Sequence, residues 1–267
     1  MLEDHLEMSN TELDLQEELN RLGEWLLGAE EEKRAEVAGR LVEAFSSVKD
    51  REFLLIHNPG GWGNTRLELC LDWERSIVNG VAETMKELGR SWALVQYFRS
   101  GNNFWHHMRD VGKESRFFFR SRSRQAEVMA EELRLLTRRF PHLKVVLVGA
   151  SQGAAFGNAV MRELGGDFPV YSIELGIFFP HMPRRVLTKR TLAIDTNGLM
   201  PDPMANRNLK AGFKAYLLAF LRWFRYRVQA KPVKFTNCIN VPGHEYRWEY
   251  PEVQGKIREF LRANFGS

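Results

Sequence analysis

Short apolar runs alternate with longer amphipathic segments from Phe53 to the end of the chain. The short runs are typical of buried strands, whereas the longer segments have the apolar spacing of helices. A chain that alternates strands with helices builds a parallel sheet whose crossovers cover both of its faces. We therefore predict an α/β fold with a mostly parallel central sheet and helices on both faces. Strands are expected within residues 53–61, 92–98, 144–149, 169–175, 190–195 and 233–241, and helices over residues 72–89, 124–140, 152–164, 207–228 and 250–265.

The first fifty residues precede this pattern and are predicted to be helical throughout. Two apolar stripes at helical spacing lie on either side of a charged stretch, where Gly28 is expected to end the first helix. We assign residues 1–50 to an N-terminal helical appendage and residues 51–267 to the α/β domain. The two stripes consist of Leu13, Leu19, Leu22, Trp25 and Leu26, and of Val37, Leu41, Val42, Phe45 and Val48.

Composition limits the compartment and the cofactors that we expect. A chain of 267 residues that is 44% hydrophobic can bury a sizeable core. Cys70 and Cys238 are too few for a disulfide framework, and neither has a neighbour at metal-ligand spacing, so free thiols and no metal are expected. The acidic start lacks the basic residues of a signal peptide, and no apolar run is long enough to span a membrane. We expect a cytoplasmic protein.

Charge is divided unevenly along the chain. Residues 1–50 carry fourteen acidic and five basic side chains, so the remainder of a protein with a net charge of +4 is basic. A basic body can bind nucleic acid, but no helix-turn-helix, zinc-finger or RNA-recognition motif accompanies it. We therefore expect no nucleic-acid partner.

A serine lies between two glycines where a predicted strand turns into a helix, in the sequence Gly-Ala-Ser-Gln-Gly at residues 149–153. A sharp turn of this kind forces its apex residue into a strained positive-φ conformation. Side chains two positions before and two after the apex would collide, which explains Gly149 and Gly153. The turn would lift the hydroxyl of Ser151 clear of the sheet, at the positive end of the following helix.

This strand-elbow-helix arrangement resembles the α/β-hydrolase superfamily, whose nucleophile elbow is G-x-S-x-G. The glutamine after the serine is similar to the cutinase-like and small carboxylesterase branches. The resemblance covers residues 53–265 and implies that Ser151 is the nucleophile of a serine esterase that needs no cofactor.

The resemblance also implies an oxyanion loop after the strand that begins at Phe53. In the superfamily, a backbone N–H of this loop and the N–H after the nucleophile together hold the developing oxyanion. The loop donor is expected around Asn58 to Gly60, and Gln152 supplies the other N–H. This chain departs from the superfamily pattern because Pro59 has no N–H to donate.

His244 follows the last predicted strand and is expected to be the general base. A serine hydroxyl needs such a base to remove its proton, and Ser151 before His244 matches the chain order of the superfamily. Three acids remain open as the partner of this histidine. Asp202 is the first choice because Asp202-Pro203 reproduces the Asp-Pro pair of the superfamily loop. Asp195, at the end of an apolar run, and Glu174, at the end of the preceding strand, are the alternatives.

Two further regions are candidates for substrate contacts. The segment from Tyr97 to Arg124 is too long for an ordinary connection, and its aromatic side chains are expected to line an acyl site. Residues 207–234 carry eight basic and no acidic side chains together with an apolar helical stripe. We favour packing of that stripe on the sheet, with weak contact to an anionic membrane surface as the alternative. The expected substrate-binding residues are His57, Trp62, Phe104 and Trp105.

The sequence thus predicts a serine hydrolase that cleaves a carboxylic ester, with a hydrophobic acyl group, through an acyl-enzyme intermediate. Its substrate would be a small ester or a lipid. Two alternatives are an acyltransferase on the same scaffold and a non-catalytic hydrolase-like binding protein.

Overall fold

The computed structural model describes residues 31–61, 63–99, 123–206, 218–219, 221, 223–229 and 241–266. Five strands form one sheet in the order β2-β1-β3-β4-β5, and all neighbouring strands are parallel. The predicted α/β fold with a parallel sheet is therefore confirmed. The sixth expected strand, residues 233–241, lies outside the described residues except for its last position. The strands are β1 Phe53–Asn58, β2 Trp92–Gln96, β3 Lys144–Ala150, β4 Val170–Leu175 and β5 Thr191–Ile194.

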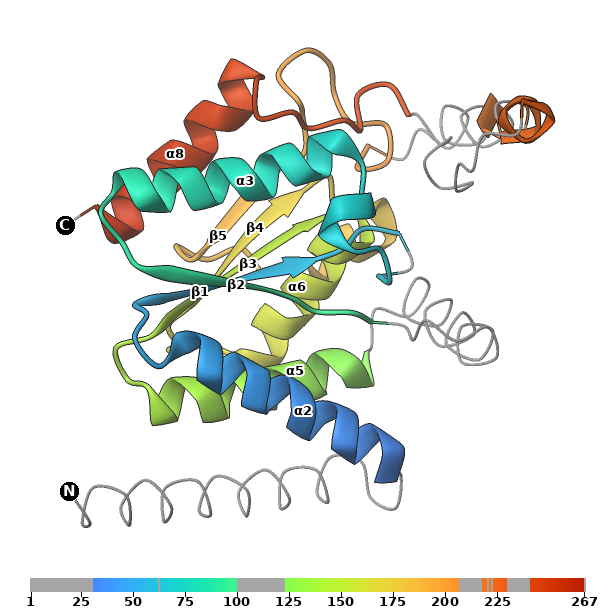
Figure 1. Ribbon diagram of the computed structural model, residues 1–267. Coiled ribbons are helices and arrows are strands. Elements are labelled where there is room, and N and C mark those ends of the chain that lie inside the picture. The colour runs from blue at the N-terminus through green and yellow to red at the C-terminus, as the bar shows by residue number, and fades with distance from the viewer. Residues whose placement is uncertain are drawn as a thin grey trace, which may run out of the picture.

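Helices cover both faces of this sheet (Figure 1). α3 (Asp72–Glu87) and α8 (Pro251–Phe265) pack together on one face. α2 (Glu31–Val48), α5 (Arg124–Arg139) and α6 (Gln152–Leu164) cover the other. Two short 3₁₀ helices, η1 (Leu67–Leu69) and η2 (Phe179–Arg184), lie in the connections.

Alternation along the strands divides the core into two layers. In β1, Leu54 and Ile56 join the cluster under α2, α5 and α6, whereas Phe53 and Leu55 join the cluster under α3 and α8. All six residues of β1 are buried, as expected for a parallel strand that is covered on both faces. The short apolar runs of the sequence therefore mark strands with no solvent-facing side.

α2 is the part of the N-terminal appendage that the structure describes. Its residues Val37, Leu41, Phe45 and Val48 are buried against the sheet and α5, as the second predicted stripe requires. Val42 belongs to the same predicted stripe but is exposed, because it lies away from the buried side of the helix. The first predicted stripe and Gly28 lie outside the described residues.

His181 is a buried titratable group in η2, and it gives the fold a pH dependence. Burial, together with Arg162, Arg184 and Arg99, lowers the pKa of His181 to about 4. The unfolded chain binds this proton near pH 6.5, whereas the folded chain does not bind it until about pH 4. Stability from this group is therefore complete above pH 6.5 and is lost as the pH falls toward 4.

We expect His181→Gln to reduce this acid sensitivity. Between pH 7 and pH 5, the free energy of unfolding of the wild-type protein should fall by about 2 kcal/mol more than that of the variant. Urea unfolding of both proteins at the two pH values measures the difference. Equal losses in the two proteins would show that His181 is not held neutral.

Candidate active site

Ser151 lies between the end of β3 and the start of α6, in a strained backbone conformation. Its φ is 54° and its ψ is −114°, and it is the one non-glycine residue with positive φ in the part of the chain that the structure describes. The backbone N–H of Ser151 donates to the carbonyl oxygen of Leu175, at 2.8 Å, which ties the turn to the end of β4. The serine therefore occupies a sharp elbow at the carboxyl edge of the sheet.

The two glycines around Ser151 are required by close backbone approaches. A Cβ at Gly149 would lie 2.5 Å from the carbonyl carbon of Gly153. A Cβ at Gly153 would lie 2.1 Å from the carbonyl oxygen of Asn58, at the end of β1. The glycines predicted from the elbow pattern therefore allow the turn to close and let the first turn of α6 contact the loop after β1.

The contact between Gly153 and Asn58 can be tested by one methyl group. Gly153→Ala should lower the free energy of unfolding by about 1–3 kcal/mol, because the new Cβ cannot be accommodated without moving backbone. Gly39→Ala is the matched control. Gly39 lies on α2, no atom of the described residues lies within 4 Å of a Cβ built there, and alanine should be neutral or stabilising. Urea unfolding of both variants gives the comparison. A Gly153→Ala protein as stable as the wild type would contradict the close packing of elbow and loop.

The structure brings His244 and Asp202 together. The Nδ1 atom of His244 lies 2.7 Å from Oδ2 of Asp202, which is fully buried, while the histidine side chain is partly exposed. The other carboxylate oxygen of Asp202 accepts from the backbone N–H of Met204 at 2.8 Å. Of the three acids that the sequence left open, Asp202 is the one paired with His244.

Tyr246 also donates to this carboxylate, which the sequence did not suggest. Its hydroxyl lies 2.6 Å from Oδ2 of Asp202, the oxygen that also contacts His244. Burial raises the pKa of Tyr246, and the Asp202 carboxylate raises it further, so the hydroxyl keeps its proton and remains a donor. Gly176 makes room for the pair, because a Cβ there would lie 2.2 Å from Asp202. Three hydrogen bonds thus hold the carboxylate of Asp202 in place.

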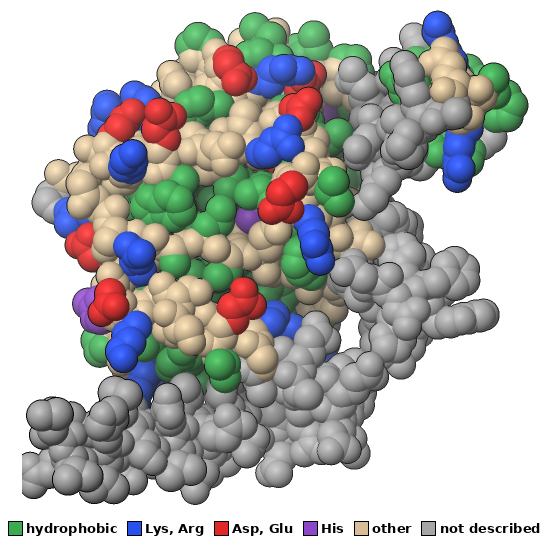
Figure 2. Space-filling model, viewed as in Figure 1, with side chains coloured by type: hydrophobic (Ala, Val, Ile, Leu, Met, Phe, Trp, Pro, Cys, Tyr) green, Lys and Arg blue, Asp and Glu red, His purple; other side chains and the backbone are tan. Residues whose placement is uncertain are grey.

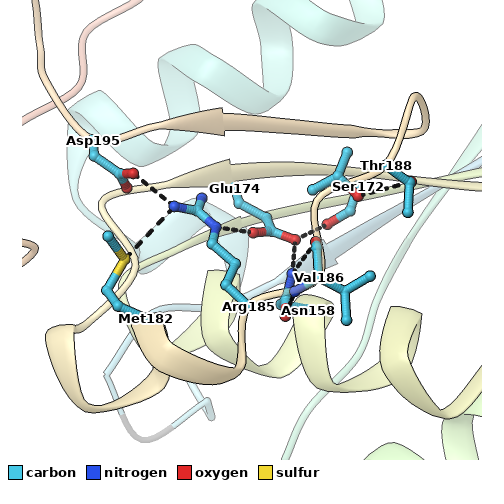
Figure 3. Close-up of polar contacts among 9 residues, drawn as sticks. Asn158, Ser172, Glu174, Met182, Arg185, Val186, Thr188 and Asp195 are labelled. Atoms are coloured by element: carbon cyan, nitrogen blue, oxygen red, sulfur yellow. Dashed lines mark hydrogen bonds and ion pairs between the residues drawn. The ribbon is translucent and has the colours of Figure 1, made fainter.

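The other two acids are held by Arg185 instead (Figure 3). Nε of Arg185 lies 2.8 Å from Glu174, and its Nη1 lies 2.6 Å from Asp195. Glu174 also accepts from Asn158 and Ser172, at 2.8 and 3.1 Å. Burial raises the pKa of Glu174 despite the opposing effect of Arg185. These two carboxylates belong to an ionic cluster that joins β4, the end of β5 and the connection between them, with Glu174 and Arg185 buried and Asp195 partly exposed.

The loop after β1 is held from one side by Glu74 of α3. The backbone N–H of Gly60 donates to Oε1 of Glu74 at 2.9 Å, and Nε2 of His57 lies 3.1 Å from the same oxygen. Nδ1 of His57 contacts Gln96 at 3.1 Å. His57 is fully buried, so it supports the loop instead of lining a surface that a substrate could reach. The N–H of Gly60, an expected oxyanion donor, is already engaged with Glu74.

Arg99 holds the same loop from the other side. Its guanidinium donates to the carbonyl oxygens of Pro59 and Gly61, each at 2.8 Å, and its backbone N–H donates to Gly63 at 2.9 Å. The arginine side chain is 1% exposed and lies over the ring of Phe156 in α6. Two buried side chains of opposite charge therefore fix the conformation of the predicted oxyanion loop.

Two buried amide side chains lie beside the elbow. Asn58 is the last residue of β1, and Gln152 is the first residue of α6. Both are buried, and neither side-chain amide has a hydrogen-bond partner within the described part of the chain. The backbone N–H of Gln152 belongs to the first turn of α6, where N–H groups have no partner inside the helix.

These parts meet at the carboxyl edge of the sheet, where parallel α/β sheets bind ligands. Ser151 contacts Leu175, the last residue of β4. Gly176 follows Leu175 in the chain and lies against the carboxylate of Asp202. The ring of Trp73, the neighbour of Glu74 in α3, lies 6.3 Å from the ring of His244. Among the described residues, no hydrogen bond joins Ser151 to His244.

Other candidates remain outside the described residues or outside the site. Trp62, Phe104 and Trp105, the expected substrate contacts, are not described. Cys70 is a buried free thiol whose pKa burial raises to about 12, with Glu74 contributing. Cys238 is not described. Across the described residues, no three His, Cys, Asp or Glu side chains are grouped so that they could hold a metal ion.

Two comparisons with known proteins add no relative to these observations. No protein-family model matches the chain, and none of the curated proteins compared with it matches significantly. None of the helices in the described ranges is both long and apolar enough to cross a bilayer.

Proposed function

We propose that this protein is a serine hydrolase of the α/β-hydrolase type that cleaves a carboxylic ester. The observation that carries the proposal is the strained Ser151 elbow at the same sheet edge as the His244–Asp202 pair. A strained residue at a helix N-terminus and a histidine paired with a buried carboxylate both suit nucleophilic catalysis. A structural serine would gain nothing from either feature.

The proposed reaction begins with attack of Ser151 Oγ on the ester carbonyl carbon. His244 accepts the serine proton at Nε2, because its Nδ1 faces Asp202. When the tetrahedral intermediate collapses, His244 returns that proton to the departing alcohol, and the acyl group stays on Ser151. Water then attacks the acyl-enzyme by the same route and releases the carboxylic acid.

Backbone N–H groups would stabilise the negative oxygen of the intermediate. The N–H of Gln152 is one donor, at the positive end of α6. Because the Gly60 N–H is engaged with Glu74, we assign the second donor to the next N–H of the loop, that of Gly61. Among the described residues, no atom lies within 4 Å of a Cβ built at Gly61.

A set of p-nitrophenyl esters of increasing acyl length tests this function. Wild-type protein should release p-nitrophenol faster than Ser151→Ala, and the preferred acyl length would define the substrate class. No turnover of any ester by folded protein would favour the non-catalytic alternative. Ser151 and His244 share no hydrogen bond in the described part of the chain, and catalytic hydrogen bonds of this kind often tighten only when substrate binds.

A further inference from the structure

A helical segment near residues 218–229 presents an apolar face to solvent. Leu218, Leu221, Phe224 and Val228 are spaced by three or four residues and are all exposed. Phe224 is 59% and Val228 72% exposed, whereas Ala219 on another side of the segment is fully buried. An exposed run of large apolar side chains at helical spacing is unusual on a surface that only meets water.

This exposure differs from the packing that the sequence favoured. The predicted stripe contains Phe224 and Val228, and neither is covered by the sheet or its helices. The other members of the stripe, Leu209, Phe213, Tyr216, Leu217 and Phe220, lie outside the described residues. The described part of the stripe is therefore exposed to solvent, and we ask which partner could cover it.

Cationic side chains accompany this face. Arg225 and Arg227 are both exposed, and the guanidinium of Arg227 lies 5.2 Å from the ring centre of Trp223. The sequence from Arg207 to Lys234 contains eight basic and no acidic residues. Figure 2 shows the segment as a group of green and blue side chains at the upper right, and Figure 1 draws it beyond the end of the sheet toward which the strands point.

We propose that this segment docks the protein on an anionic lipid surface. Apolar side chains that enter the acyl region, with arginines at the depth of the headgroups, are typical of helices that lie in a membrane interface. A bilayer supplies the apolar region and the negative charge together along the whole segment. The acidic segment of residues 1–50 in a second copy of the chain could also pair with these arginines. Docking of a second copy is therefore the competing outcome of the test.

Docking here would define the substrate more closely. We expect the substrate to be an ester with a hydrophobic acyl chain that lies in a membrane, and this inference about the substrate rests on the proposed function. The docking does not rest on that function, because it requires no catalysis. Binding can therefore be measured in the Ser151→Ala protein, where loss of activity has no influence.

Co-sedimentation with vesicles tests the docking. Full-length protein should bind vesicles that contain phosphatidylglycerol and should bind vesicles of phosphatidylcholine alone at least about tenfold more weakly. High salt should release it. Phe224→Glu and the double variant Arg225→Glu/Arg227→Glu should each weaken binding about tenfold or more. Val42→Glu is the matched control, because Val42 is an apolar residue 44% exposed on α2, and it should bind as the wild type does.

Two results would overturn the docking proposal. One is that the wild-type protein binds neither kind of vesicle, or binds both kinds equally and the two variants bind as well as the wild type does. The other is a fall in solution mass, measured by size-exclusion chromatography with light scattering, that Phe224→Glu causes without any change in vesicle binding. That second result would assign the apolar face to another copy of this chain.

Discussion

Ser151→Ala should lower the rate of ester hydrolysis by about 10³-fold or more, because it removes the nucleophile and leaves only binding and the oxyanion donors. His244→Ala should cost about as much, and the double variant should be little slower than either single one. Residues that act as one unit show this pattern, since losing any member disables the unit. Steady-state kinetics on the preferred p-nitrophenyl ester measures all three rates.

Ser46→Ala is the matched control for this series. Ser46 is exposed on α2, and its hydroxyl donates to the carbonyl oxygen of Val42 within the same helix, so its removal should leave the rate unchanged. Unfolding measurements on each variant separate a loss of rate from a loss of folded protein. Losses that multiply in the double variant would show that Ser151 and His244 act independently, and the proposed mechanism would then fail.

Asp202→Asn should reduce kcat by about 10²–10⁴-fold while the protein stays folded. The amide can replace the carboxylate in size, but its NH₂ group faces Nδ1 of His244 and favours the wrong tautomer of the ring. The amide oxygen then takes the Oδ1 position and accepts from the backbone N–H of Met204. Tyr246 contacts the same position as His244, so its hydroxyl must turn to accept a hydrogen bond from the NH₂ group. The kcat of the variant, compared with its unfolding curve, gives the result.

Asp195→Asn is the matched control for Asp202→Asn. Asp195 contacts Arg185 at 2.6 Å, and its backbone carbonyl accepts from the Asp202 N–H at 3.3 Å. Replacing its side chain should lower stability through the weakened ion pair and leave kcat within a few-fold of the wild type. The opposite outcome, in which Asp195→Asn loses turnover and Asp202→Asn keeps it, would reject Asp202 as the catalytic acid.

Local sequence patterns predicted the parts of this fold that depend on local sterics. The apolar runs marked the five described strands, and the Gly149 and Gly153 positions followed from the close approaches of an elbow. The Asp202–His244 pair could be ranked first but not assigned, because its geometry depends on how the loops after β5 and before α8 meet.

Contacts between segments that are distant in the chain could not be predicted from the sequence. Nothing in the pattern around His57 indicates that Glu74 and Gln96 occupy both of its ring nitrogens, which makes it a buried support of the loop. Tyr246 likewise belongs to no recognised motif. Its contact with Asp202 depends on the packing of both side chains against Gly176, far away in the sequence. Such pairs are fixed by tertiary packing, which no single segment encodes.

Labelling with a fluorophosphonate probe tests the central claim most directly. The probe forms a stable phosphonyl ester only with a serine whose hydroxyl is activated by a base and whose oxyanion site is intact. Intact mass and peptide mapping of the wild-type protein should show one adduct, on Ser151, and the Ser151→Ala and His244→Ala proteins should show almost none. Well-folded wild-type protein that stays unlabelled, or that carries the adduct on another residue, would contradict the assignment of Ser151 as the nucleophile.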